Sequence, residues 1–296
     1  MCPFESDRRY HFDKVLELTD IANAILLGIV EGLTEFLPVS STAHLLLTSY
    51  LINFQPVKNN LFEIVIQLGA ILAICVLYRQ KIFDILWNLK RKPQQKFVLN
   101  LILAFMPAAF IGSVFHGFIK SFLFTNFVIA LALIVGGILM IIVDYKPFNS
   151  RSTKHTETSS AQSAQSTKIN DLYKITYSTA FYIGLFQCLA MIPGISRSGA
   201  TIIAGLLLGL NRKTAAEFSF FLAIPTIAAA SFYDLFKNTA ELTYVNIEII
   251  LLGLASSFVA AILVIKWFVN FISKNSFAPF GIYRIIVGIL VLLCLQ

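Results

Sequence analysis

The chain has 296 residues, of which 57% are hydrophobic and only 13% are charged, and its formal net charge is +7. Soluble domains carry about a quarter charged residues, so this composition excludes an ordinary soluble protein and predicts an integral membrane protein, in line with a mean hydropathy of +0.77. The basic residues lie in loops between apolar runs, which is typical of membrane topology and argues against nucleic-acid binding.

The first 20 residues are polar and rich in acidic side chains, so we expect no secretory signal peptide there. We therefore divide the chain into a polar extension, residues 1–20, and a single membrane domain, residues 21–296. The cysteines are scattered without CxxC spacing, which predicts neither a disulfide framework nor a zinc site.

Six apolar runs are long enough to cross about 30 Å of hydrocarbon as helices. They occupy residues 62–78, 97–115, 127–143, 216–232, 247–265 and 280–295. Two further apolar stretches, 21–52 and 177–210, are each interrupted near the middle by proline and small or hydroxyl residues. Because proline removes a helical hydrogen bond and clashes with the preceding turn, we expect each stretch to form a helix, a break and a second helix.

The basic residues orient the chain. The loops 79–96 and 144–174 are rich in lysine and arginine, whereas 116–126 and 233–246 carry one basic residue each. The positive-inside rule places the first pair in the cytoplasm and the second pair outside. Arg212 and Lys213 are also on the inner side by this rule, so the stretch 177–210 enters and leaves on one face as a re-entrant hairpin. The stretch 21–52 fits a second hairpin from outside, or a single crossing.

The two halves of the membrane domain resemble each other. An offset of 156 residues matches Gly28 with Gly184, Glu31 with Gln187 and Ser40 with Ser196. We therefore predict repeat one over 21–143 and repeat two over 177–296, joined by a cytoplasmic loop, 144–174, whose segment 149–168 is of low complexity. Each half holds one hairpin and three crossings, so the second half is inverted. Inverted repeats with broken helices build one central polar site in transporters.

Two short runs place costly polar groups inside apolar sequence. In the first, Glu31 and Glu35 lie one helical turn apart, so they repel each other in a low dielectric and favour a shared proton or a bound cation. Hydroxyl and imidazole groups follow at the break, where free backbone N–H groups can cradle an anion. These groups belong to Ser40, Ser41, Thr42 and His44.

The second run, from Pro193 to Thr201, is suited to phosphate. Gly194 and Gly199 let the backbone approach a ligand, and Arg197 stands between Ser196 and Ser198. A planar, permanently charged guanidinium can grip phosphate with two hydrogen bonds. Together the two runs supply positive charge, a nucleophile and a proton carrier, the combination that phosphoryl transfer needs.

The remaining polar residues of the apolar runs are expected to have structural roles. Arg284 is near enough to the cytoplasmic side to snorkel. Glu63, Gln67 and Glu217 lie near helix ends, where they cap or pair, and His116 is expected at a solvated loop edge.

The two motifs resemble those of a known family. The run Glu-Gly-Leu-Thr-Glu-Phe-Leu-Pro-Val-Ser-Ser-Thr-Ala-His, residues 31–44, is similar to the (E/Q)xxxE region of bacterial undecaprenyl-diphosphatases, the bacitracin-resistance family. The run Pro-Gly-Ile-Ser-Arg-Ser-Gly-Ala-Thr, residues 193–201, is similar to that family's PGxSRSxxT motif. The resemblance covers about residues 21–296. It departs from the family at Ala43, where glycine is common, and in the segment 149–168 and the polar extension.

The resemblance implies a multi-pass enzyme of the bacterial inner membrane. Such an enzyme removes the terminal phosphate of undecaprenyl diphosphate at a site open to the periplasm, with a divalent cation such as Mg²⁺ or Ca²⁺. Glu31 and Glu35 would hold the cation or move protons, and Arg197 would clamp the diphosphate with Ser196, Ser198, Thr201 and backbone N–H groups. The nucleophile stays open between Ser41 and His44, with a slight preference for Ser41 and for His44 as acid–base.

Two further questions stay open at this point. An inverted repeat with a central site is also compatible with a transporter or flippase of polyprenyl phosphate. The buried carboxylates, imidazole and hydroxyls favour bond breaking, because a carrier needs counter-charge but no nucleophile. A homodimer is compatible with the sequence, which does not decide the oligomeric state.

Overall fold

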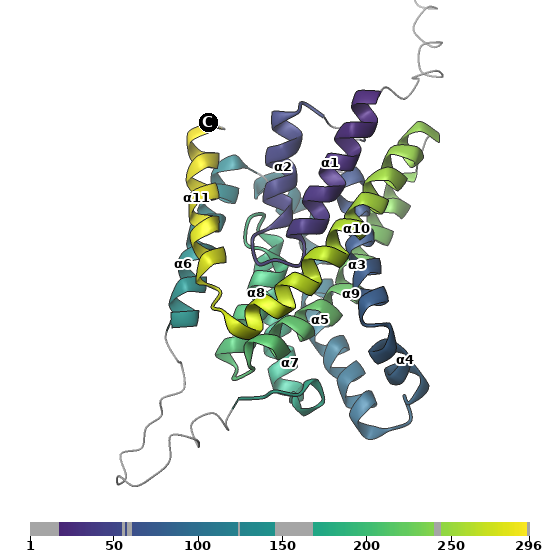
Figure 1. The fold of residues 1–296 in the computed structure, drawn as a ribbon, viewed down its shortest axis with the longest axis vertical. Coiled ribbons are helices and arrows are strands. Elements are labelled where there is room, and N and C mark those ends of the chain that lie inside the picture. Colours follow the sequence, from purple (N-terminus) through teal and green to yellow (C-terminus); the bar gives the residue numbers. More distant parts are fainter. Residues whose placement is uncertain are drawn as a thin grey trace, which may run out of the picture.

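The structure is a computed structural model that describes residues 18–54, 57, 61–123, 125–145, 168–239 and 244–294, and these residues form helices and connecting turns. The helices, shown in Figure 1, are α1 (Leu18–Thr34), α2 (Ser41–Leu51), α3 (Leu61–Leu77), α4 (Arg79–Trp87), α5 (Lys92–Phe122), α6 (Asn126–Tyr145), α7 (Tyr177–Gln187), α8 (Arg197–Leu207), α9 (Arg212–Lys237), α10 (Tyr244–Lys274) and α11 (Ala278–Cys294). Two short 3₁₀ turns, η2 (Leu172–Lys174) and η3 (Cys188–Met191), flank α7. The predicted all-α membrane architecture is confirmed.

Each of the six predicted spans falls on one helix. Among the described residues, α5, α6, α9 and α10 are long and apolar enough to cross a membrane, and α3 forms a bent pair with α4 at an angle of 74°. The 17-residue helix α11 is shorter and apolar. Seventeen residues rise about 26 Å, which is close to the hydrocarbon thickness, so α11 and α3 also fit as spans.

Two predicted loops are wrong in part. The basic segment 79–96 contains α4 and the start of α5 instead of an irregular loop. Its exposed apolar side chains, Phe83, Leu86 and Trp87, give α4 a face that suits the membrane interface, and the abundance of lysine and arginine hid this pattern. Helix α5 also continues to Phe122, so His116 lies inside a helix and not at a loop edge. The predicted polar extension up to residue 17 and the segment 149–167 lie outside the described residues.

Both broken stretches have the predicted helix–break–helix form. The first break separates α1 from α2, and the second separates α7 and η3 from α8. Ser40 and Ser196, the residues immediately before α2 and α8, have left-handed backbone conformations with φ of 74° and 72°. In Figure 1, α1 and α2 occupy the upper half and α7 the lower half, so the two breaks, which we call the hairpin tips (residues 35–40 and 192–196), approach each other from opposite sides.

The two hairpins also dock in matching ways. A Cβ on Gly28 of α1 would lie 2.2 Å from the carbonyl oxygen of Gly253 in α10. A Cβ on Gly184 of α7 would lie 2.4 Å from the carbonyl oxygen of Ala104 in α5. Only glycine permits either contact, and these two glycines are partners at the offset of 156. The matching contacts agree with a repeat, and the inversion of the second half stays a prediction.

Phenylalanine side chains fix the first tip against the core. Phe36 is fully buried and packs edge-to-face on Phe220 of α9, with ring centroids 5.2 Å apart. Phe220 in turn contacts Phe268 of α10 at 6.1 Å. Such aromatic pairs contribute about 0.5–1.5 kcal/mol beyond their buried area. Because Phe36 directly follows Glu35, this packing also fixes where the Glu35 carboxylate can lie.

Candidate active site

An ion pair joins the two hairpin tips. Arg197 Nη2 donates to Glu35 Oε1 at 3.0 Å, and both side chains are largely buried. Beside it, the hydroxyl of Ser198 donates to the carbonyl of Leu37 at 2.8 Å. The structure therefore brings together, across 162 residues of sequence, the carboxylate of the first motif and the guanidinium of the second.

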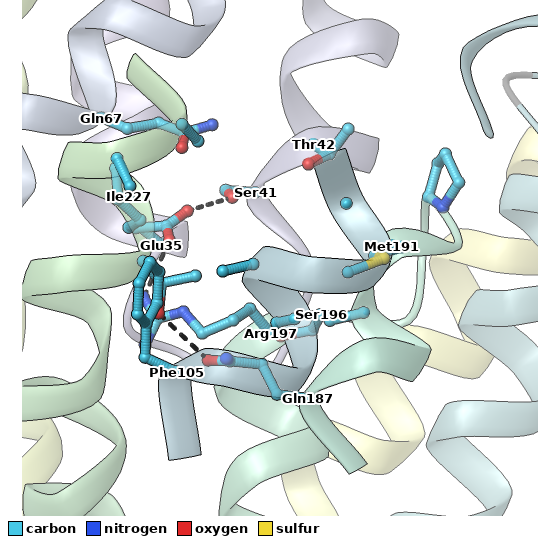
Figure 2. A pocket seen from close by; sticks show the side chains of 18 of the residues that line it. Glu35, Ser41, Thr42, Gln67, Phe105, Gln187, Met191, Ser196, Arg197 and Ile227 are labelled. Atoms are coloured by element: carbon cyan, nitrogen blue, oxygen red, sulfur yellow. Dashed lines mark hydrogen bonds and ion pairs between the residues drawn. The ribbon is translucent and has the colours of Figure 1, made fainter. Parts of the chain in front are cut away.

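The second oxygen of Glu35 binds a hydroxyl. Ser41, the first residue of α2, donates its Oγ–H to Glu35 Oε2. Figure 2 shows the row formed by Ser41, Glu35 and Arg197, in which the carboxylate lies between the hydroxyl and the guanidinium. A carboxylate in hydrogen-bond contact with a serine hydroxyl can accept its proton, which is how a weak oxygen nucleophile is activated.

Arg197 is held in place by several contacts. Its Nη1 donates to the carbonyl of Ser219 at 2.9 Å, and its guanidinium carbon lies 5.6 Å from the centre of the Phe36 ring. Its Nε is buried and has no hydrogen-bond partner in the part of the chain that the structure describes. A buried donor without a partner costs free energy. The guanidinium as a whole lines the cavity and brings a positive charge to its polar end.

The three residues open onto a cavity of about 460 Å³. The residues of the two predicted motifs that line it are Glu35, Ser40, Ser41, Thr42, Pro193, Gly194, Ser196 and Arg197. Apolar side chains from α5, η3 and α9, including Phe105, Met191 and Ile227, form other walls, as Figure 2 shows. The cavity thus combines a polar, charged end with apolar walls, as expected for a ligand that has a charged head and a hydrocarbon chain.

Four predicted residues lie behind the cavity wall and not in it. Gly199 donates its N–H to Ser196 Oγ at 3.1 Å and so caps α8. Thr201 donates to Ser219 Oγ at 2.7 Å, and Ser198 bonds the first tip as described. Glu31 is completely buried in α1. Their positions support the shape of the site, and a direct contact with a ligand stays a prediction for each of them.

Both ring nitrogens of His44 form hydrogen bonds within the protein. Its Nδ1 lies 2.7 Å from the carbonyl oxygen of Ser40, and its Nε2 lies 2.7 Å from the hydroxyl of Tyr283 in α11. A carbonyl only accepts hydrogen bonds, so Nδ1 carries the proton, and Nε2 of the neutral ring accepts from Tyr283. His44 is not among the residues that line the cavity, and its contacts hold the backbone of Ser40 in place beside Ser41.

Comparisons with known proteins show the family to which this chain belongs. The family model described as bacitracin resistance protein BacA matches residues 24–290. The chain belongs to this family. Among curated relatives, the undecaprenyl-diphosphatase of Methylobacillus flagellatus is 43% identical over 277 residues, which cover 94% of this chain and 98% of the relative. The undecaprenyl-diphosphatases of Sulfurihydrogenibium sp. and Sinorhizobium medicae are 46% and 47% identical and cover 90% of this chain, and 96% and 94% of the relatives.

Glu31, the first glutamate of the first motif, has a buried carboxylate. No hydroxyl or N–H group within the described ranges donates to either of its carboxylate oxygens. It lies close enough to Glu35 for the two carboxyl groups to share a hydrogen bond, and close enough to Arg197 to interact electrostatically. A second carboxylate beside Glu35 fits a hard divalent cation, which prefers oxygen ligands. Within the same ranges no third acidic, histidine or cysteine side chain joins them, so hydroxyls, water or the ligand itself would complete the coordination.

Sequence reasoning missed several residues of the site. Gln67, Gln187, Thr226, Tyr233 and Asp234 all line the cavity. Gln67, which was expected to cap or pair near a helix end, thus lies in the cavity wall. The match between Gln187 and Glu31 at the offset of 156 was the available signal for Gln187, whose Nε2 is buried without a partner among the described residues.

Among the other residues with predicted structural roles, some predictions hold and one is wrong. Glu217 forms an ion pair with Lys81 at 3.3 Å, as expected for a residue near a helix end. Glu63 is buried, and its Oε2 has no partner in the described part of the chain. The predicted snorkelling of Arg284 is wrong: its side chain is only 1% exposed and bonds to backbone carbonyls inside the protein.

Proposed function

We propose that this protein hydrolyses undecaprenyl diphosphate to undecaprenyl phosphate and inorganic phosphate. This reaction returns the lipid carrier to cell-wall synthesis and confers bacitracin resistance. The observation that carries the proposal is the row Ser41–Glu35–Arg197 at the charged end of an otherwise apolar cavity. Membership of the bacitracin resistance family and the names of the relatives support the same activity.

In the proposed reaction, Ser41 is the nucleophile and Glu35 the base. The Ser41 proton moves to Glu35, Oγ forms a bond to the terminal phosphorus, and the bond from that phosphorus to the bridging oxygen breaks. Undecaprenyl phosphate leaves with the electron pair of that bond. Water then attacks the phosphoserine, which restores the Ser41 hydroxyl and releases inorganic phosphate. The occupied ring nitrogens of His44 favour Ser41 over His44 as the attacking group.

Arg197 supplies the positive charge that the reaction needs. Arg197 lines the cavity, so its guanidinium can donate to a phosphate oxygen there. Charge that builds on the phosphate oxygens during transfer is stabilised by such a fixed donor, because the donor does not have to reorganise. Glu31 and Glu35 would hold a divalent cation, Mg²⁺ or Ca²⁺, which supplies further neutralisation of the diphosphate when bound.

The apolar walls of the cavity suit the prenyl chain. The basic residues at one end of α9 indicate from which side of the membrane the lipid enters. The cavity is lined by Tyr233 and Asp234, near the end of α9 that closes with Lys237. The opposite end of α9 begins with Arg212 and Lys213, which the positive-inside rule places in the cytoplasm. We therefore propose that the site opens to the periplasmic side of the inner membrane.

The test is phosphate release from undecaprenyl diphosphate by the purified protein in detergent. Glu35→Ala and Arg197→Ala should each lose activity. Elution volume and melting temperature should show that both variants remain folded. Glu217→Gln is the matched control, because it removes a carboxylate that pairs with Lys81 outside the cavity. Equal activity of all four proteins, or no release by the parent protein, would contradict the proposal.

A transporter of polyprenyl phosphate remains the second candidate, and one observation favours it. The site lies between two hairpins that approach from opposite sides, as in carriers that expose one site alternately. Reconstitution of Ser41→Ala in vesicles separates the two activities. A transporter would still move lipid phosphate across the bilayer in this variant, whereas an enzyme alone would do neither.

A further inference from the structure

A single arginine outside both motifs connects the two hairpin tips. Arg284 of α11 is the largest of the fully buried side chains in the described residues, and a buried guanidinium is expensive unless its N–H groups are bonded. Its hydrogen bonds go to backbone carbonyls, and within the described ranges it forms no ion pair. The acceptors are Pro38 (3.1 Å), Ile195 (2.8 Å), Gly194 (2.9 Å), Ala132 (3.2 Å) and Leu133 (3.4 Å).

These carbonyls come from three separate segments. Pro38 belongs to the first hairpin tip, Gly194 and Ile195 belong to the second, and the other two lie in α6. Carbonyls in a broken helix lose their helical donors, and inside a membrane protein each one needs a replacement. The guanidinium carries five N–H donors in a rigid plane. It can therefore satisfy both tips and α6 at once, which a single ammonium group cannot do.

The backbone around Arg284 is shaped to admit it. A Cβ on Gly136 of α6 would lie 2.2 Å from Arg284 Nη2, and a Cβ on Gly199 of α8 would lie 3.0 Å from Nη1. A side chain at position 136 would displace the guanidinium. The glycine there is thus part of the same arrangement.

The carbonyl bonds also fix the peptide planes next to the site. The described peptide bonds are all trans, so a carbonyl that faces Arg284 turns the N–H of the next residue the opposite way. The next residue after Ile195 is Ser196, which lines the cavity and precedes Arg197. Only Val39 and Ser40 separate Pro38 from Ser41 in the sequence.

We propose that Arg284 is a positioning residue for the phosphatase reaction: it holds the two tips in register, so that Ser41 and Glu35 from the first hairpin meet Arg197 from the second. The proposal rests on the proposed function. Arg284 lies on neither motif and contacts the cavity through the backbone of the tips.

The test compares Arg284→Lys with the parent protein. Lysine keeps the charge but offers three donors and no plane, so the tips shift relative to each other. A displacement of this kind lowers kcat by about 10²-fold, while KM stays within about threefold because the groups that bind the lipid are still present. Gly136→Ala keeps the arginine but pushes it from its place, and should reproduce the same loss.

Arg212→Lys is the matched control. Arg212 also bonds with two N–H groups, to Asp144 at 2.9 and 2.7 Å, but it lies at the start of α9, away from the tips. This variant should keep the parent kcat even where its melting temperature falls. It separates the effect of a weakened arginine contact in general from the effect of a shift between the tips.

Backbone hydrogen exchange gives a readout that does not depend on activity. In Arg284→Lys, exchange should be faster in peptides covering 36–42 and 192–198 and unchanged in α10. Parent-level kcat and exchange in this variant would overturn the proposal. A loss of activity no larger than the unfolded fraction, with unchanged exchange in both tips, would also overturn it. If the parent protein releases no phosphate, the proposed function fails, and the exchange measurement still decides the role of Arg284.

Discussion

The two hairpins have similar backbone conformations but differ in the chemistry of their side chains. In each, a proline-containing break ends in a left-handed serine, Ser40 or Ser196, and a new helix starts at the next residue. At the offset of 156, that next residue is Ser41 in the first hairpin and Arg197 in the second. The same structural position thus presents a hydroxyl from one side and a guanidinium from the other.

The acidic positions diverge in the same way. Glu31 corresponds to Gln187, and Glu35 corresponds to Met191. The first hairpin is therefore acidic and the second basic, and the two charges meet in the Glu35–Arg197 ion pair. In the proposed site, the unlike charges of the two hairpins are what phosphoryl transfer needs, because each hairpin alone would lack either the base or the anion clamp.

The largest expected effect comes from Ser41, where the two hairpins differ most directly. Ser41→Ala removes the proposed nucleophile, and we expect kcat to fall by at least about 10³-fold, as for other enzymes that lose their nucleophile. Phosphate release measures the loss. Ser49→Ala is the control, since Ser49 is a buried serine of the same helix outside the cavity. Retention of activity in Ser41→Ala would give the attack to another group or to water.

The second prediction exchanges the charges between the hairpins. Glu35→Arg or Arg197→Glu alone places like charges together in a buried site, and breaking a buried pair costs about 3–5 kcal/mol. The double variant restores an ion pair, so we expect its melting temperature to recover while its activity does not. Unfolding in detergent and phosphate release measure the two properties. Recovery of activity in the double variant would mean that only the pairing matters and not which tip carries the base.

The sequence was informative where the signal is local. Apolar run length predicted the helices on which the six expected spans fall, and Pro38 and Pro193 predicted both breaks. Both signals act on the residues beside them. The two motifs also supplied residues that the structure brings to one cavity, including Glu35, Ser41 and Arg197. By contrast, Arg284 was misread as a snorkelling residue, because its carbonyl partners lie at Pro38 and Ile195, far away in sequence. No periodicity within α11 indicates which loops pack beside it.

The third prediction makes the first hairpin resemble the second at one position. Glu31→Gln reproduces the residue type found at position 187, and it removes one of the two carboxylates that would hold a cation. We expect Mg²⁺ or Ca²⁺ to raise the melting temperature of the parent protein and to leave that of the variant unchanged. Without cation, the variant should be the more stable, by about 1–3 kcal/mol, because a buried carboxylate without donors is removed.

Glu63→Gln is the control for this measurement. Glu63 is also a buried glutamate with an unpartnered oxygen in the described part of the chain, but it does not line the cavity. Its variant should keep the response to cation. A cation response that survives in Glu31→Gln would remove Glu31 from the proposed site.

The smallest effect concerns the left-handed serines themselves. Ser196 accepts the Gly199 N–H at 3.1 Å and so caps α8, whereas the Ser40 side chain makes no such bond to α2. Ser196→Ala should therefore lower the free energy of unfolding by about 1 kcal/mol, and Ser40→Ala by less. Both variants keep a Cβ in the left-handed region, so backbone strain is the same and the difference isolates the cap. Equal melting temperatures for the two variants would mean that the α8 cap adds nothing to stability, and that the hairpins differ only in the charges they bring to the site.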